Sequence, residues 1–160
     1  MVTKSRVKAP GPAEDAIAER ISELILDAVT HTLSERSPEP GRRYLSAFSG
    51  GFTDEQRATE LMVTLILVRW LSAARDEVGG DLVEAVLTWI EQELGKRCAL
   101  RARYTSGPLV DEDSAAQIIR YREGLGPDFL PSMVWQLAAV VALHGDGDPR
   151  WLAERVGRSS

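Results

Sequence analysis

Two stretches of the chain are apolar on nearly every side. Residues 61–71 contain nine apolar residues among eleven, and residues 133–143 contain ten among eleven. Each stretch is too short to span a bilayer, which needs about 20 apolar residues. Each is also too evenly apolar for a surface helix, which shows a single apolar stripe. We therefore expect both stretches to form helices that protein covers on all sides.

Elsewhere, apolar residues recur at spacings of three and four, which is typical of amphipathic helices. Thr53 with Gln56, and Asp81 with Glu84, have the spacing of a capping box at the start of a helix. No stretch alternates at period two, so strands are not expected. The predicted helices cover residues 12–36, 53–77, 81–94, 111–124 (or 114–124), 131–144 and 149–157.

Together these patterns predict an all-α fold. We expect a single domain over residues 12–157, an irregular bundle of five to six helices with the two fully apolar helices at its centre. A chain of about this size buries roughly 68–70% of its unfolded surface, which is enough for a core. Residues 1–11 have the composition of a flexible basic tail, and residues 158–160 form a second short tail.

The composition excludes several classes of protein. The net charge is −5 and the pI is near 5.1, so the chain lacks the basic character of many nucleic-acid-binding domains. No apolar segment follows the basic N-terminal residues, so they do not form a secretory signal. The single cysteine, Cys98, permits no internal disulfide and suits a reducing compartment. Arginine far outnumbers lysine, which indicates a GC-rich genome. We therefore expect a cytoplasmic bacterial protein.

A basic run follows the third predicted helix and consists of Lys96, Arg97, Arg101 and Arg103. If that helix continued past Gly95, two of these arginines would extend its apolar face, where charged residues are rarely buried. Either the helix breaks at Gly95, or the arginines meet acidic partners or an anion. We favour ordinary ion pairing or solvent exposure over a site for an anion or an acidic partner. Nucleic-acid binding would need this run and the N-terminal tail on one surface.

The segment 37–52 is long for a connection between helices. It contains Arg42 and Arg43, and the pair Gly50-Gly51 precedes the cap of the next helix. Glycines at a helix N-terminus can let backbone amides bind an anion. The Lys-Ser/Thr ending and the preceding strand of a P-loop are missing, however. We favour a loop with a short helical turn that packs over the core through Tyr44, Leu45 and Phe48.

Arg69 lies inside the most apolar part of the second predicted helix, between Val68 and Trp70. An unpaired buried charge is very costly, so its side chain must reach water, pair with a carboxylate or hold a ligand. We predict an ion pair with a carboxylate from another helix. If the protein instead binds a small anionic ligand, Arg42, Arg43 and Arg69 are the residues that we expect to hold it.

No combination of residues predicts a catalytic site, a metal site or a cofactor. Asp27, His31 and Glu35 can share one helical stripe, but three ligands on one straight helix cannot surround a metal. Nucleophile motifs and phosphate-binding or dinucleotide-binding glycine runs are absent. Residues 152–160 resemble the first helix and turn of a helix-turn-helix DNA-binding motif, but the sequence ends where the recognition helix would begin. We expect this segment to be a terminal packing helix.

These features favour a small interaction or regulatory module over an enzyme. Enclosing two apolar helices in one small bundle is difficult, so some apolar surface should remain exposed. Exposed apolar patches usually mark interfaces. We expect a homodimer, or a stable complex with another protein, that buries helix 12–36 or part of helix 53–77. The alternatives are a helical protein with a small-molecule or anion pocket and, less favoured, a nucleic-acid-binding protein. We expect no membrane association.

Overall fold

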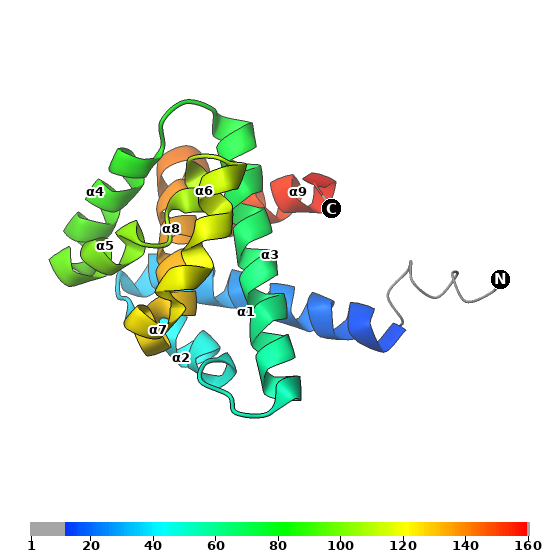
Figure 1. The fold of residues 1–160 in the computed structure, drawn as a ribbon. Helices are drawn as coiled ribbons and strands as arrows, with labels where there is room; N and C mark the ends of the chain where they lie inside the picture. Colours follow the sequence, from blue (N-terminus) through cyan, green and yellow to red (C-terminus); the bar gives the residue numbers. More distant parts are fainter. Residues whose placement is uncertain (1–11, 160) are drawn as a thin grey trace.

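The fold is a bundle of helices, and the part of the chain that the structure describes contains no strand. The structure is a computed structural model that describes the backbone of residues 12–159 and the side chains of residues 15–155 (Figure 1). The all-α prediction is confirmed. The basic tail predicted over residues 1–11 lies outside the described residues. The helices are α1 (Pro12–Glu35), α2 (Glu39–Leu45), α3 (Asp54–Val78), α4 (Val83–Leu94), α5 (Lys96–Arg103), α6 (Glu112–Gln117), α7 (Arg122–Leu125), α8 (Phe129–His144) and α9 (Pro149–Ser159). Short 3₁₀ segments are η2 (Ser46–Phe48), η3 (Gly107–Leu109), η4 (Ile118–Tyr121) and η5 (Gly126–Asp128).

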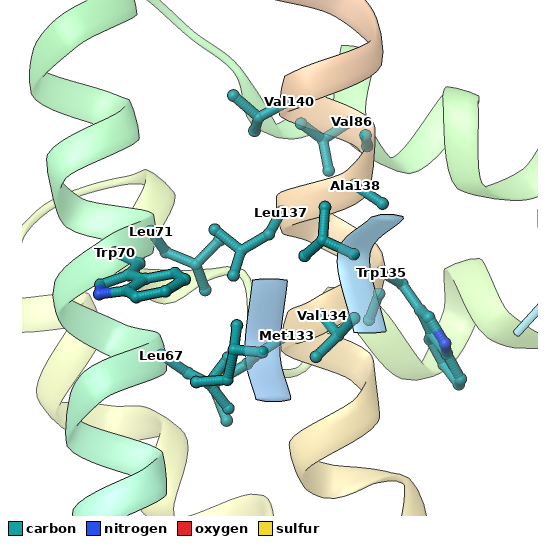
Figure 2. Close-up of a cluster of buried hydrophobic side chains, with 14 of the residues drawn as sticks. Leu67, Trp70, Leu71, Val86, Met133, Val134, Trp135, Leu137, Ala138 and Val140 are labelled. Carbon is teal, nitrogen blue, oxygen red and sulfur yellow. The ribbon is translucent and has the colours of Figure 1, made fainter. Parts of the chain in front are cut away.

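Helix α8 runs through the middle of the bundle, with α3 on one side and α4 and α5 on the other (Figure 1). Every residue from Phe129 to Val141 is buried, so the prediction of complete enclosure is confirmed up to residue 141. Figure 2 shows α3 and α8 side chains meeting across this core, with Leu67 and Leu71 close to Met133 and Leu137. The last turn of α8 extends beyond the core, and Leu143 in this turn is 42% exposed.

Helix α3 does not have the predicted environment. Its buried side faces α8, but Leu61 and Leu65 are 51% and 57% exposed. Arg69, two turns beyond Leu61, is also exposed, so the expectation that residues 61–71 are covered on all sides is wrong. One helix in a bundle of this size can be surrounded by its neighbours, and α8 occupies that position. Helix α3 lies outside it and keeps a solvent-facing stripe.

The basic run begins a separate helix, because the chain breaks at Gly95. This residue has a φ of 114°, a conformation that glycine adopts without the steric cost that a side chain would bring. The break ends α4 and starts α5 at Lys96, so the arginines do not extend the apolar face of α4. The sequence left open whether the helix breaks at Gly95 or its arginines meet acidic partners or an anion, and the structure has the break.

The predicted capping residues have mixed outcomes. The box at the start of α3 is confirmed, since Thr53 Oγ1 accepts from the Gln56 N–H at 3.1 Å and Gln56 Oε1 accepts from the Thr53 N–H at 3.1 Å. The box between Asp81 and Glu84 does not form. Asp81 Oδ1 instead accepts from the Val83 N–H at 3.2 Å, one residue short of the predicted register.

Two predicted elements are divided differently in the structure. The segment 37–52 contains the short helices α2 and η2, and Leu45 of α2 is fully buried, as the favoured interpretation required. The fourth predicted helix is split into α6, η4 and α7, although Asp111 does cap it by accepting from the Ser114 N–H at 2.7 Å. Both changes add short elements to the five or six helices that were expected.

Three buried polar side chains, those of Gln136, Thr105 and Ser132, form a hydrogen-bonded cluster within the apolar core. Gln136 is the single polar residue between Val134 and Val141, and its Nε2 donates to Thr105 Oγ1 at 2.7 Å and to the Ala102 carbonyl at 3.1 Å. Thr105 Oγ1 in turn hydrogen-bonds to Ser132 Oγ at 2.8 Å.

The stretch 112–144 includes an 18-residue window that is apolar enough to cross a membrane, but 83% of this window is buried inside the protein. A buried core helix passes the same test.

Candidate functional site

Two of the arginines singled out from the sequence meet at one carboxylate. Arg42 donates from Nε to Asp128 Oδ1 at 2.9 Å and from Nη2 to Asp128 Oδ2 at 3.1 Å. Arg101 reaches Asp128 Oδ2 at 3.3 Å. The Arg42 guanidinium also lies 5.4 Å from the centre of the Trp135 ring, a cation–π distance. Asp128 is 8% exposed, so this cluster joins α2, α5 and α8 at the edge of the core.

In this cluster the arginines form ion pairs that connect parts of the fold. Hydrogen bonding to Asp128 raises the pKa of Arg42 above its ordinary value, and Glu39 adds a second ion pair. Both oxygens of the Asp128 carboxylate are contacted by guanidinium groups, so Arg42 and Arg101 are already paired within the protein. For Arg101 this is the ion pairing that was favoured over an anion site for the basic run.

The other predicted site residues are dispersed. Arg43 pairs with Glu35 at 3.2 Å, and Arg103 pairs with Glu84 at 3.2 Å. Lys96, Arg97 and Arg69 are exposed and have no ion pair among the described residues. The predicted carboxylate partner of Arg69 is therefore wrong, because its side chain points into solvent from the outer side of α3. Neither of the two clefts described below is lined by Arg42, Arg43 or Arg69.

Cys98 lies in α5 close to the Asp128 cluster and is 4% exposed. Burial raises the pKa of its thiol, and the nearby positive charges of Arg42 and Arg101 offset only part of that rise. A thiol with a raised pKa holds little thiolate at neutral pH, so it is a poor nucleophile. The geometry gives Cys98 a packing role.

Native Cys98 should therefore react slowly with a thiol reagent. We expect its reaction with a disulfide reagent such as DTNB at pH 8 to be at least about tenfold slower in the native protein than in denaturing guanidinium chloride, because burial limits both access and ionisation. Absorbance of the released thiolate measures the rate directly, since Cys98 is the only thiol in the chain. Equal rates in the two conditions would show that the thiol is open to solvent.

Sequence reasoning missed a second ion pair, between Glu60 of α3 and Arg122 of α7. The Arg122 guanidinium donates from Nε to Glu60 Oε2 at 2.7 Å and from Nη2 to Glu60 Oε1 at 2.6 Å. Glu60 is 4% exposed, and this hydrogen bonding raises the pKa of Arg122. A signal was present, because Glu60 shares a helical face with Val63, Thr64 and Leu67 at spacings of three, four and seven.

Two open clefts flank this ion pair. One, of about 390 Å³, is lined by Arg57, Glu60, Leu61, Thr64, Ile119, Arg120, Arg122 and Glu123. The other, of about 310 Å³, lies toward η2 and η5 and shares Glu60, Arg122 and Glu123 with the first. The ion pair therefore lines both clefts, and Leu61 and Ile119 also line the first of them.

The first cleft continues into the solvent-facing stripe of α3. Arg57, Leu61, Leu65 and Arg69 follow one another at intervals of four residues, so they lie along one side of the helix. Ile119 of η4 is 49% exposed, and together with Arg120 it lines the cleft that Arg57 and Leu61 also line. We call these residues the α3 face, which consists of Arg57, Leu61, Leu65, Arg69, Ile119 and Arg120.

The clefts are lined by glutamate, arginine, hydroxyl and apolar side chains. Among the described residues no group of three His, Cys, Asp or Glu could hold a metal ion. In the same part of the chain, neither histidine side chain hydrogen-bonds to a serine, threonine or cysteine side chain; His31 contacts the Asp27 carbonyl and the Tyr44 hydroxyl. The site offers apolar contact and positive charge, which are the means of binding.

Comparison with known proteins adds no assignment. No family model matches the chain, and neither a curated protein nor a solved structure is significantly similar to it.

Proposed function

We propose that this protein is a small interaction module that binds another protein chain through the α3 face. The observation that carries the proposal is the pair Leu61 and Leu65, which are 51% and 57% exposed and lie one helical turn apart. Burying a leucine side chain fully contributes roughly 1.5–3 kcal/mol, so a partner that covers both could gain a substantial part of its binding energy there. Single exposed apolar residues are ordinary on protein surfaces, but adjacent ones flanked by polar residues are typical of interfaces.

The cleft beside Glu60 favours a second candidate function, the binding of a small anion. Three arginines line it, namely Arg57, Arg120 and Arg122. Glu60 and Glu123 line it as well, so two of the three positive charges are offset. Arg122 is also already held by both oxygens of Glu60. The exposed leucines are better explained by a protein partner than by a small ligand.

Photo-cross-linking in the source cell tests the proposed function. We expect a photoreactive residue at position 65 to form a discrete cross-linked product with a protein, either another chain or a second copy. The same residue at position 84, exposed on α4, is the control and should give no product of that mass. Absence of any product specific to position 65 would contradict the proposal.

Light scattering with size exclusion separates the two kinds of partner. A mass of 17.6 kDa for the purified protein would mean that the partner is a different chain. Twice that mass, returning to 17.6 kDa in Leu65→Gln, would mean that the α3 face joins two copies. The Leu65→Gln side chain stays exposed, so this substitution should leave the melting temperature nearly unchanged.

A further inference from the structure

The arginines without a partner gather at the α3 face. Nine described arginine side chains form ion pairs within the chain. Three of those that form none, Arg57, Arg69 and Arg120, belong to the α3 face, and the others are Arg20 and Arg97. The chain as a whole carries a net charge of −5, so this grouping of arginines without ion pairs is a local feature.

Nearby acidic residues offset only part of that charge, and the exposed Asp54 lies about one turn before Arg57 on α3. Glu60 is buried and bound to Arg122. Asp76, further along α3, is bound to Arg75 at 3.2 Å. Glu123 lines the cleft together with Arg57 and Arg120 and offsets part of their charge. Arg57 and Arg69 flank the exposed leucines at the two ends of the stripe, and Arg120 lies on the side of η4.

We propose that the α3 face binds an acidic amphipathic helix of another protein, an inference that rests on the proposed function. Two large apolar side chains of that helix would cover Leu61 and Leu65. Aspartate or glutamate residues beside them would meet the three free arginines. The distance along α3 from Arg57 to Arg69 is roughly 18 Å, so the bound segment spans about three to four helical turns. Apolar anchors at helical spacing are the usual means by which a helix is recognised on such a surface.

Charge disfavours a second copy of this chain as the occupant. An antiparallel two-fold pairing that places Leu61 against Leu65 of the other copy also places Arg57 against Arg69 of the other copy. The same contact occurs twice by symmetry. Like charges placed against each other across an interface are destabilising and oppose the gain from burying the leucines.

The N-terminal segment of this chain is disfavoured for the same reason. Residues 1–11 contain Lys4, Arg6 and Lys8 and no acidic residue. Such a segment would bring positive charge to a surface that is already positive. An acidic helix supplied by another protein satisfies both the apolar and the charged parts of the surface.

Fluorescence anisotropy with three designed helical peptides tests this inference on the full chain. Each peptide is about 16 residues long, which gives a helix of roughly 24 Å, and carries the same leucines at spacings of three and four. The residues beside the leucines are glutamates in the first peptide, glutamines in the second and lysines in the third. We expect the glutamate peptide to bind at least about tenfold more tightly than the lysine peptide, and its affinity to fall as salt rises.

Matched variants locate the binding on the α3 face. Leu61→Gln with Leu65→Gln should abolish saturable binding of the glutamate peptide. Arg57→Gln with Arg69→Gln should weaken its binding about tenfold and flatten the salt dependence. The controls are Arg97→Gln and Leu100→Gln on α5, an unpaired arginine and a leucine that is 57% exposed. These controls should leave the affinity unchanged, and circular dichroism should show that all the variants are folded.

Several outcomes would overturn the inference. Equal affinities for the glutamate and lysine peptides, or no saturable binding of either, would show that charge does not select the partner. A dimer lost in Leu65→Gln would assign the face to a second copy, and peptide binding that appears only after removal of residues 1–11 would assign it to the N-terminal segment. A cross-link from position 65 to a basic segment would also overturn this inference, while the proposed function itself would stand. Only the absence of a position-specific cross-link removes both.

Discussion

Ala139→Asp should abolish the folded state. Ala139 is fully buried in α8, and its neighbours Ala138 and Val140 are fully buried too. A carboxylate placed there has no partner, and its burial costs far more than the loss of a hydrogen bond. A domain of this kind is stable by only about 5–15 kcal/mol, so one such group consumes most of that margin. Thermal unfolding followed by circular dichroism should show no cooperative transition, and tryptophan fluorescence should be shifted to that of exposed rings.

The matched control is Ala85→Asp. Ala85 is exposed near the N-terminus of α4, where a negative charge also interacts favourably with the helix dipole. We expect its free energy of unfolding to stay within about 0.5 kcal/mol of the parent. A cooperative transition at the parent temperature in Ala139→Asp would show that α8 is not enclosed, and the centre of the fold would have to be reassigned.

Asp128→Ala should produce the second-largest loss of stability. The substitution removes the acceptor of two hydrogen bonds from Arg42 and of the ion pair with Arg101. Breaking a buried pair in this way costs about 3–5 kcal/mol, but the side chains of Arg42 and Arg101 can still reach water. Their exposures are 34% and 28%, so we expect about 2–3 kcal/mol. Chemical denaturation monitored by tryptophan fluorescence measures this difference.

Two further variants show whether the loss comes from the cluster. Asp27→Ala removes an exposed aspartate that has no ion pair, so it should change the free energy of unfolding by no more than about 0.5 kcal/mol. In the background of Arg42→Ala, the effect of Asp128→Ala should become smaller, because the two residues stabilise each other. Additive effects of the two substitutions would mean that the cluster contributes nothing as a unit.

The sequence was sufficient for the local features of the fold. Apolar spacing predicted most of the helices, and the pairing of Thr53 with Gln56 located the start of α3 because a capping box involves only neighbouring residues. The uniformly apolar stretch 133–143 correctly predicted a central helix, because a segment that is apolar on every side has to be enclosed by the rest of the fold. The buried role of Gln136 followed from its position within that stretch.

Pairings between distant residues could not be derived in this way. Arg42 and Asp128 are 86 positions apart, and Glu60 and Arg122 are 62 apart, so only the packing of α2, α3 and α7 around α8 brings them together. The sequence identified Arg42 and Arg101 as groups needing a partner, but it did not indicate that both would find Asp128. Glu60 was not identified from the sequence. Its place on a buried helical face indicated that its carboxylate needs a positively charged partner from another element, which is Arg122.

The α3 face was decided by the tertiary structure alone. Residues 61–71 and 133–143 are almost equally apolar, and composition gives no means of telling which helix will be surrounded. The difference arises because a central position needs neighbours on every side, and only α8 has them. The sequence by itself therefore determined that this protein is an all-α helical bundle with apolar helices at its centre, but it predicted two enclosed helices where the structure has one. Packing determined that the second apolar helix would present Leu61, Leu65 and Arg69 to solvent.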